Sequence, residues 1–180
     1  MLWMDKLSEI GGLMKTITAI LLLLSCCAFG PGALGQDKAA VSAAAAACGP
    51  RDVHFAVAVN HSVHPAPAPE NEKALIYVVE RATGVMRFGA DGKWLGALKP
   101  GTYLFASIDP GQHHLCVTGH LPLWKGLSLH EVTAKAGETC YFFVHVVAGG
   151  GYNELTLSEV GQDEGKELVA RAKFSVSHPK

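Results

Sequence analysis

The chain lacks an excess of charge of either sign. Its 180 residues include 15 lysines and arginines against 16 aspartates and glutamates, which gives a formal net charge of −1 at pH 7. A protein that binds nucleic acid neutralises phosphates with a basic stripe. Here the acids and bases are interspersed, and no acidic or basic tail is present. The composition therefore argues against a nucleic-acid partner.

The short motifs that usually carry chemistry are also missing. The sequence contains no G-x-S-x-G, no phosphate-binding glycine loop and no C-x-x-C. His130-Glu131 begins a phrase like that of the zinc proteases, but its fifth position is Ala134. The phrase also looks like a strand, whereas the zinc motif needs a helix to bring both imidazoles to one face. We therefore expect a protein that is not an enzyme and that uses no cofactor or metal.

No apolar run near the N-terminus reaches the roughly 20 residues that a membrane-spanning helix needs. Residues 16–29 are mostly apolar, follow Lys15 and are ended by Gly30-Pro31-Gly32. Small residues then precede Gln36, which completes the order of regions in a secretory signal. We expect residues 1–35 to be a signal peptide with Met14 as its true start, and the protein to be exported to the periplasm or beyond the cell.

Lipid attachment is the alternative to plain secretion. Leu23-Leu24-Ser25-Cys26 resembles a bacterial lipoprotein cleavage box. If it acts as one, Cys26 carries the lipid and the protein stays anchored to a membrane through that lipid alone.

The exported part divides into a tether and one domain. Residues 36–47 are alanine-rich, which favours helix, but so short a helix is marginal alone. Residues 48–180 are the length of a single domain. Within it, alternate prolines at residues 65–69 predict a stiff surface connector.

Short strand-like runs separated by turn signals dominate that domain. Residues 74–79 are apolar on both faces, as in a central strand covered on both sides. Asp91-Gly92 is the pair typical of a tight hairpin. We expect strands at residues 53–59, 74–79, 85–88, 94–96, 102–108, 112–118, 127–134, 139–147 and 152–158. Because helices do not alternate with them, the pattern predicts a mainly β, antiparallel β-sandwich.

One short helix is expected near the C-terminus. Residues 162–172 place acids in the first turn and bases later, as the helix dipole prefers. A narrow apolar stripe of Leu168, Val169 and Ala172 would face the domain.

Three cysteines, Cys48, Cys116 and Cys140, follow the signal. In an oxidising compartment the expected outcome is one disulfide and one leftover thiol. A Cys116–Cys140 bond would cross between two predicted strands, and a Cys48–Cys116 bond would tie the end of the tether to the sheet. The residues alone leave both pairings open.

Histidines suggest an alternative function. His113 and His114 are adjacent on a predicted strand, so their side chains should point to opposite faces. His114 and Cys116 share a face, and His120 or His145 could supply a further ligand. The alternative hypothesis is therefore a metal- or thiol-dependent enzyme that uses His114, Cys116 and His145.

Four phrases carry a resemblance to a family. They are CGPRDVHF at residues 48–55, KALIYV at 73–78, DGKWLG at 91–96 and PGQHHLC at 110–116. Together they resemble exported bacterial proteins of the domain-of-unknown-function 2846 family, over about residues 48–147. The D-G-K-x-x-G and P-G-x-H pattern also resembles PEGA-type surface modules, which are small β-sandwiches.

The resemblance implies an Ig-like or PEGA-like β-sandwich, and it implies no catalytic residues, since the family has no established activity. It also implies that Cys48 pairs with Cys116 and that Cys140 stays reduced and buried.

The expected function is a non-catalytic binding or structural module of the cell envelope, with an envelope protein or glycan as partner. Aromatic and apolar residues in loops are typical contact anchors. The loop at residues 119–126 is unusually apolar, so it is expected either to fold back as a lid or to offer a contact patch. The candidate contact residues are Trp94, Leu121, Leu123, Trp124 and Tyr152.

Overall fold

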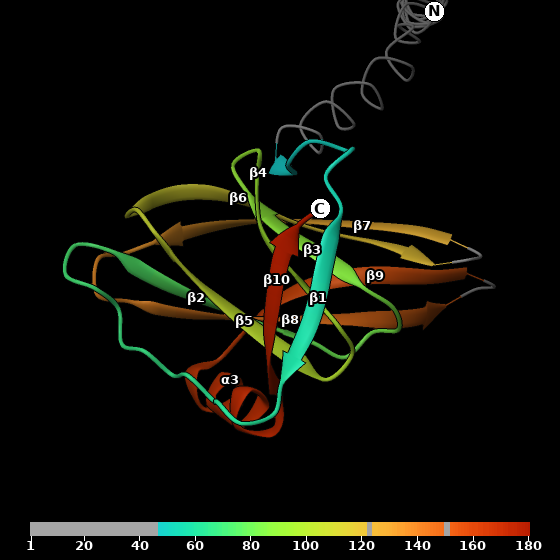
Figure 1. The fold of residues 1–180 in the computed structure, drawn as a ribbon. Coiled ribbons are helices and arrows are strands. Elements are labelled where there is room, and N and C mark those ends of the chain that lie inside the picture. The colour runs from blue at the N-terminus through green and yellow to red at the C-terminus, as the bar shows by residue number, and fades with distance from the viewer. Residues whose placement is uncertain (1–46, 122–123, 150–151) are drawn as a thin grey trace, which may run out of the picture. The chain divides into compact units, whose positions relative to one another are not determined.

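The computed structural model describes residues 47–121, 124–149 and 152–180 (Figure 1). The expected signal peptide, Cys26 and all but the last residue of the expected tether lie outside the described residues. The strands are β1 (Phe55–Asn60), β2 (Ala74–Glu80), β3 (Met86–Ala90), β4 (Lys93–Leu98), β5 (Thr102–Ile108), β6 (Gly111–Leu121), β7 (Trp124–Ala134), β8 (Thr139–Gly149), β9 (Tyr152–Val160) and β10 (Lys173–Pro179). The helix α3 (Gln162–Arg171) lies between β9 and β10, which confirms the expected mainly β fold with one short helix near the C-terminus.

The strands form two sheets. One has six strands in the order β1-β10-β5-β2-β8-β9, and the other has four in the order β4-β3-β6-β7. The four-stranded sheet is antiparallel throughout. The six-stranded sheet is mixed, because β2 pairs with β8 in parallel and β10 pairs with β5 in parallel.

The expectation of a wholly antiparallel arrangement is therefore wrong at these two pairs. Parallel neighbours need a long crossover connection. Between β2 and β8 the chain forms β5 and all four strands of the four-stranded sheet, and between β5 and β10 it passes through both sheets and α3.

The main core lies between the two sheets and is lined by both. Ile76 and Phe142 reach it from the six-stranded sheet, and Phe88 and Leu115 from the four-stranded sheet; all four are fully buried. Strand β2 is buried along its whole length. Its even-numbered apolar residues join this core and its odd-numbered ones join a second cluster on the far face, so the expected central strand, covered on both faces, is confirmed.

Helix α3 covers that far face. Val169 and Ala172 pack in the second cluster with Tyr77, Tyr103 and Tyr141 of the six-stranded sheet. Acidic residues occupy the first turn of the helix and Arg171 the last, as the dipole favours. No helix within the described ranges is long and apolar enough to cross a membrane.

Two hairpins test the sequence-based expectation of the turns. The Asp91-Gly92 hairpin is confirmed, and both residues have the positive φ, 49° and 79°, that such a turn requires. The expected loop at residues 119–126 is wrong, because β6 and β7 continue pairing through Gly119↔Gly126 to Leu121↔Trp124. The two strands thus form one long hairpin, and residues 122–123 between them lie outside the described residues.

Strand β10 was not expected from the sequence. Phe174 and Val176 alternate with Ser175 and Ser177, and the serines resemble loop residues. In the fold they link the sheets: Ser175 donates its hydroxyl to the Ala97 carbonyl (2.8 Å), and the Ala97 N–H donates to the Ser177 hydroxyl (2.9 Å). The two hydroxyls thus satisfy both backbone groups of Ala97 on the edge strand β4.

A similar bond joins the sheets on the opposite side. There β7 and β9 lie side by side, and the Leu157 N–H donates to the Ser128 hydroxyl at 3.0 Å. Both seams between the sheets are therefore closed by serine side chains that bond to backbone groups.

Candidate functional site: the clamped N-terminal segment

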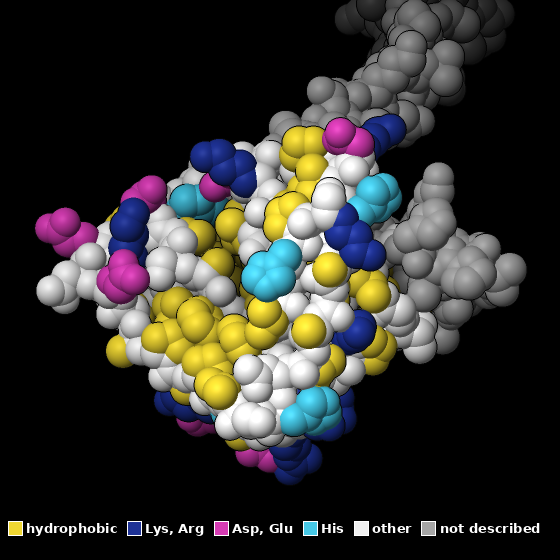
Figure 2. Space-filling model, in the orientation of Figure 1, with side chains coloured by type: hydrophobic (Ala, Val, Ile, Leu, Met, Phe, Trp, Pro, Cys, Tyr) yellow, Lys and Arg dark blue, Asp and Glu magenta, His cyan; other side chains and the backbone are white. Residues whose placement is uncertain are grey.

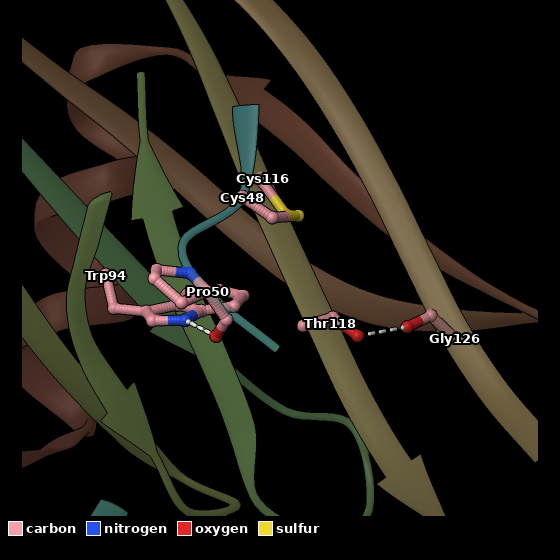
Figure 3. Close-up of a disulfide and its surroundings, with 6 residues drawn as sticks. All are labelled: Cys48, Pro50, Trp94, Cys116, Thr118 and Gly126. Atoms are coloured by element: carbon pink, nitrogen blue, oxygen red, sulfur yellow. Dashed lines mark hydrogen bonds between the residues drawn. A yellow bond between two sulfur atoms is a disulfide. The ribbon is translucent and has the colours of Figure 1, made fainter. Parts of the chain in front are cut away.

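A disulfide fixes the start of the domain to the four-stranded sheet. Cys48 bonds to Cys116 of β6, with the two Cα atoms 5.2 Å apart and the two residues separated by 68 positions in sequence (Figure 3). The inward neighbours of Cys116 are Leu115 and Val117 in the main core, so Cys116 faces outward. It is nevertheless fully buried. The pairing implied by the family resemblance is confirmed, and the Cys116–Cys140 alternative is wrong.

Trp94 of β4 holds the same segment through its indole ring. The ring N–H donates to the Pro50 carbonyl at 2.7 Å (Figure 3). The backbone of Gly49 lies directly against the ring, and a Cβ atom at that position would collide with it. Glycine is therefore required here for close approach. The half-buried Trp94 thus packs against its own chain.

Arg87 of β3 adds two further bonds. Its guanidinium lies over the Trp94 ring, with the central carbon 4.5 Å from the ring centroid. One guanidinium nitrogen donates to the carbonyls of Arg51, at 3.2 Å, and Val53, at 2.7 Å. Partial burial lowers the pKa of Arg87 from its usual value, but an arginine remains a cation in proteins.

Residues 47–53 form a unit that we call the clamped segment. The Gly92 N–H bonds to the Ala47 carbonyl at 3.2 Å and completes the set of attachments. The bonds to backbone carbonyls, the ring contact and the disulfide all come from the outer face or turns of the four-stranded sheet. This arrangement fixes residues 47–53 against the four-stranded sheet.

Cys140 is the leftover cysteine, and it is buried. It is only 5 % exposed, in β8, and bonds to no other cysteine among the described residues. Burial, and then the negative charges of Glu138 and Glu159, raise the pKa of its thiol to about 11. The thiolate is the reactive form. The expectation that Cys140 is buried is confirmed, and that it stays reduced remains a prediction.

The residues of the alternative enzyme hypothesis are not brought together. His114 is exposed on the outer face of the four-stranded sheet. His145 stacks on Phe143, which packs on the helix-covered face of the other sheet. Cys116 has no free thiol while its disulfide is intact. Within the described ranges, no three His, Cys, Asp or Glu residues are close enough to hold a metal ion.

His113 forms a charged cluster that the sequence pattern did not indicate. As expected, it points away from His114: its Nδ1 lies 2.6 Å from the Asp91 carboxylate and its Nε2 2.7 Å from the Asp109 carbonyl. Both partners accept hydrogen bonds, so the arrangement favours the protonated imidazole, in which both ring nitrogens donate. Burial alone would lower the pKa of His113, but these two bonds and the nearby acids raise it. Lys73 pairs with the Asp109 carboxylate at 2.5 Å and extends the cluster.

Glu80 is a second feature that sequence reasoning missed. It ends β2, its side chain is fully buried, and neither carboxylate oxygen has a hydrogen-bond partner among the described residues. Burial raises its pKa to about 8, although the nearby Ala82 N–H opposes the rise without forming a hydrogen bond of good geometry. Glu80 directly follows the unbroken apolar run of residues 74–79. That position was the one sequence signal for a buried carboxylate.

The remaining expected contact residues lie at the hairpin ends. The side chains of Leu121, Leu123, Trp124 and Tyr152 fall outside the described part of the chain, so the lid and the contact-patch interpretations both remain predictions. On the outward face of β7, next to that hairpin end, Leu127 is 49 % and Leu129 42 % exposed. Acidic and basic side chains are interspersed on the face seen in Figure 2.

No family model matches the chain, and no curated protein or solved structure matches it either.

Proposed function

We propose that this chain is an exported, non-catalytic module of the bacterial cell envelope. The observation that carries the proposal is the Cys48–Cys116 disulfide. Disulfides form and persist in oxidising compartments and are rare in the cytosol. Together with the apolar run and small residues that precede Gln36, the bond favours the periplasm or the cell exterior as the place where the domain works.

The module is, in this proposal, a β-sandwich of the Ig-like or PEGA-like type and a relative of the domain-of-unknown-function 2846 proteins. The core shared by the two sheets supports the first part. The phrases around Cys48, Asp91 and Cys116 that carry the resemblance also meet in space at the clamped segment.

The role proposed is binding or structural. The polar side chains that gather at the clamp bond to backbone carbonyls of the same chain. An envelope protein or glycan is the proposed partner. Leu127 and Leu129, exposed on an edge strand, are the described residues best placed to contact it, because exposed apolar side chains gathered on one face mark interaction sites.

Cell fractionation tests the export part of the proposal. The full chain and a chain lacking residues 1–35 are produced in the same bacterial host, and free thiols are alkylated during lysis. The full chain should be found in the periplasmic or membrane fraction with Cys48 and Cys116 oxidised, and the shortened chain in the cytosol with both reduced. A full chain that stays cytosolic and reduced contradicts the proposal.

Envelope binding tests the role. Purified protein is sedimented with isolated cell envelopes, and the double variant Leu127→Ser/Leu129→Ser is compared with Val85→Ser. Val85 is 41 % exposed but lies before β3, so it is a matched apolar control. Loss of binding is expected for the double variant alone, and equal binding by all three proteins would exclude β7 as the contact surface.

A further inference from the structure

Strand β1 has one free edge. It pairs with β10 in antiparallel register, with Val57 opposite Ser177. Beyond the strand, the Lys180 N–H donates to the His54 carbonyl at 2.9 Å. Since hydrogen-bonded and non-hydrogen-bonded pairs alternate along an antiparallel ladder, the backbone groups of residues 56, 58 and 60 also face β10. The N–H and C=O groups of residues 55, 57 and 59 therefore point away from it.

Those outward groups have no partner in the described part of the chain. No backbone or side-chain hydrogen bond joins the main-chain groups of Phe55, Val57 or Val59 to another described residue. Figure 1 shows β1, in teal, beside β10, and β1 is the last strand at that end of the six-stranded sheet. Unpaired groups along a strand edge are a template for another strand.

The other sheet edges differ from this one. Strand β4 is bonded at Ala97 by two serine hydroxyls, and β9 is bonded at Leu157 by Ser128 of the neighbouring β7. Each of these edges thus faces the opposite sheet. The bond between the sheets at this side joins β10 to β4. Strand β1 lies one strand further out than β10, at the end of the six-stranded sheet.

The sequence of β1 does nothing to block an incoming strand. Natural proteins protect open edges with lysines, prolines, inward charges or bulges. FAVAVN carries neither charge nor proline, and its register with β10 is unbroken. The two central side chains on its exposed face are the alanines Ala56 and Ala58, which leave room for a close neighbour.

We propose that β1 pairs antiparallel with β1 of a second copy of this chain, about a twofold axis at Val57. The outward groups at residues 55, 57 and 59 are spaced symmetrically about Val57, so the same strand reversed presents the same spacing. Val57 then faces Val57, and Phe55 faces Val59, each pair exchanging both N–H···O bonds. A net charge of −1 per chain gives little repulsion between copies, and such a self-complementary contact closes as a dimer.

This register predicts which side chains meet. Ala56 of one copy lies opposite Ala58 of the other, in a non-hydrogen-bonded pair whose Cα atoms approach to about 4.5 Å. Both alanines are exposed in the single chain, so charged residues are tolerated there by the fold. Like charges directly opposite one another destabilise a strand pair, and opposite charges stabilise it.

Two matched double variants use this pairing. In the Ala56→Lys/Ala58→Lys variant, each lysine at position 56 faces a lysine at position 58 of the other copy. In the Ala56→Lys/Ala58→Glu variant, each lysine at position 56 faces a glutamate at position 58 of the other copy. Sedimentation of the processed protein over a range of concentrations should give a monomer–dimer equilibrium for the wild type. The dimer dissociation constant should rise about tenfold or more in the first variant. In the second variant it should stay the same or fall.

A measurement on the wild type alone gives a second test. Hydrogen exchange at the amides of Phe55, Val57 and Val59 should slow as protein concentration rises, because these N–H groups become bonded in the dimer. The proposal is overturned if the wild type sediments as a monomer at every concentration and these amides exchange at a constant rate. It is also overturned if the two double variants dimerise equally.

Discussion

The guanidinium of Arg87 lies over the indole ring of Trp94, 4.5 Å from its centroid, and each of these side chains binds the clamped segment. Neighbouring strands β3 and β4 thus present two side chains that orient one another. A cation over an aromatic ring contributes about 0.5–1 kcal/mol at an exposed site. The larger consequence is that losing either side chain should release the segment from the other as well.

Trp94→Ala should destabilise the domain by about 2–3 kcal/mol, because the ring supports Gly49 and donates to Pro50. Trp94→Phe keeps most of the ring contact and loses the N–H donor, so it should cost about 1 kcal/mol. Urea unfolding with the disulfide intact measures both. The clamp interpretation fails if the two variants are equally stable.

Gly165→Ala tests the packing of α3. Alanine normally stabilises a helix interior by about 1 kcal/mol relative to glycine. Here, however, a Cβ atom would collide with the side chain of Tyr141, which is itself stacked on Tyr77 with centroids 5.3 Å apart. Because an overpacked site forces its neighbours to move, we expect a net loss of about 1–3 kcal/mol.

The matched control for this substitution is Gly161→Ala at the N-cap of the same helix. A Cβ there meets nothing within 4 Å, and φ is −64°. Its effect on thermal unfolding should be within about 0.5 kcal/mol. A stabilised Gly165→Ala protein would show that α3 does not rest on Tyr141 as described.

The sequence indicated the fold where local pattern decides the structure. Asp91-Gly92 predicted its hairpin because few residue pairs accept two successive positive φ values. Residues 74–79 predicted a doubly covered strand because they are apolar on both faces. The parallel pairing of β2 with β8 was not predictable this way, since it depends on which distant strand arrives beside β2.

The candidate site was predicted in part. The family resemblance, and not the residue pattern, indicated the Cys48–Cys116 pairing. Arg87 was missed because its partners are backbone carbonyls of Arg51 and Val53, and carbonyls carry no sequence signature. Strand β10 was missed for a related reason: Ser175 and Ser177 look like loop residues until their bonds to Ala97 are known.

His113 should make stability depend on pH. Its folded-state pKa lies above the ordinary value of 6.5, so the folded protein holds this proton more tightly than the unfolded chain. The stabilisation is complete below about pH 6.5 and is lost as pH rises through the folded-state pKa. An NMR titration of the His113 ring should give a pKa above 6.5.

Asp91→Asn is the matched variant for that titration. Asparagine tolerates the positive φ of position 91, but its amide lacks the negative charge that favours the imidazolium. The pKa of His113 should therefore fall in this variant. An unchanged value would mean that the Asp91 carboxylate does not hold the proton on His113.

Glu80 should also make the free energy of unfolding depend on pH, and the protein should become less stable as the pH rises from about 5 to about 8. With a folded-state pKa of about 8 against an ordinary 4.5, the folded protein binds one more proton than the unfolded chain between these values. Unfolding free energy should therefore decline from about pH 5 to pH 8, by up to about 5 kcal/mol. Glu80→Gln, which cannot ionise, should remove this decline. A parallel pH dependence in both proteins would contradict the buried, neutral state of Glu80.

The central claim is that the chain is exported and that its domain is closed by the Cys48–Cys116 disulfide. Non-reducing peptide mapping of the chain isolated from producing cells tests this claim most directly, because the bond requires both an oxidising compartment and the described fold. We expect a Cys48–Cys116 cross-linked peptide, a reduced Cys140 that reacts with thiol reagents only after unfolding, and an N-terminus at Gln36. Reduction should destabilise the domain by about 4 kcal/mol, since the bond closes a long loop. A protein with an intact N-terminus in which Cys48 and Cys116 are both free thiols would contradict the account.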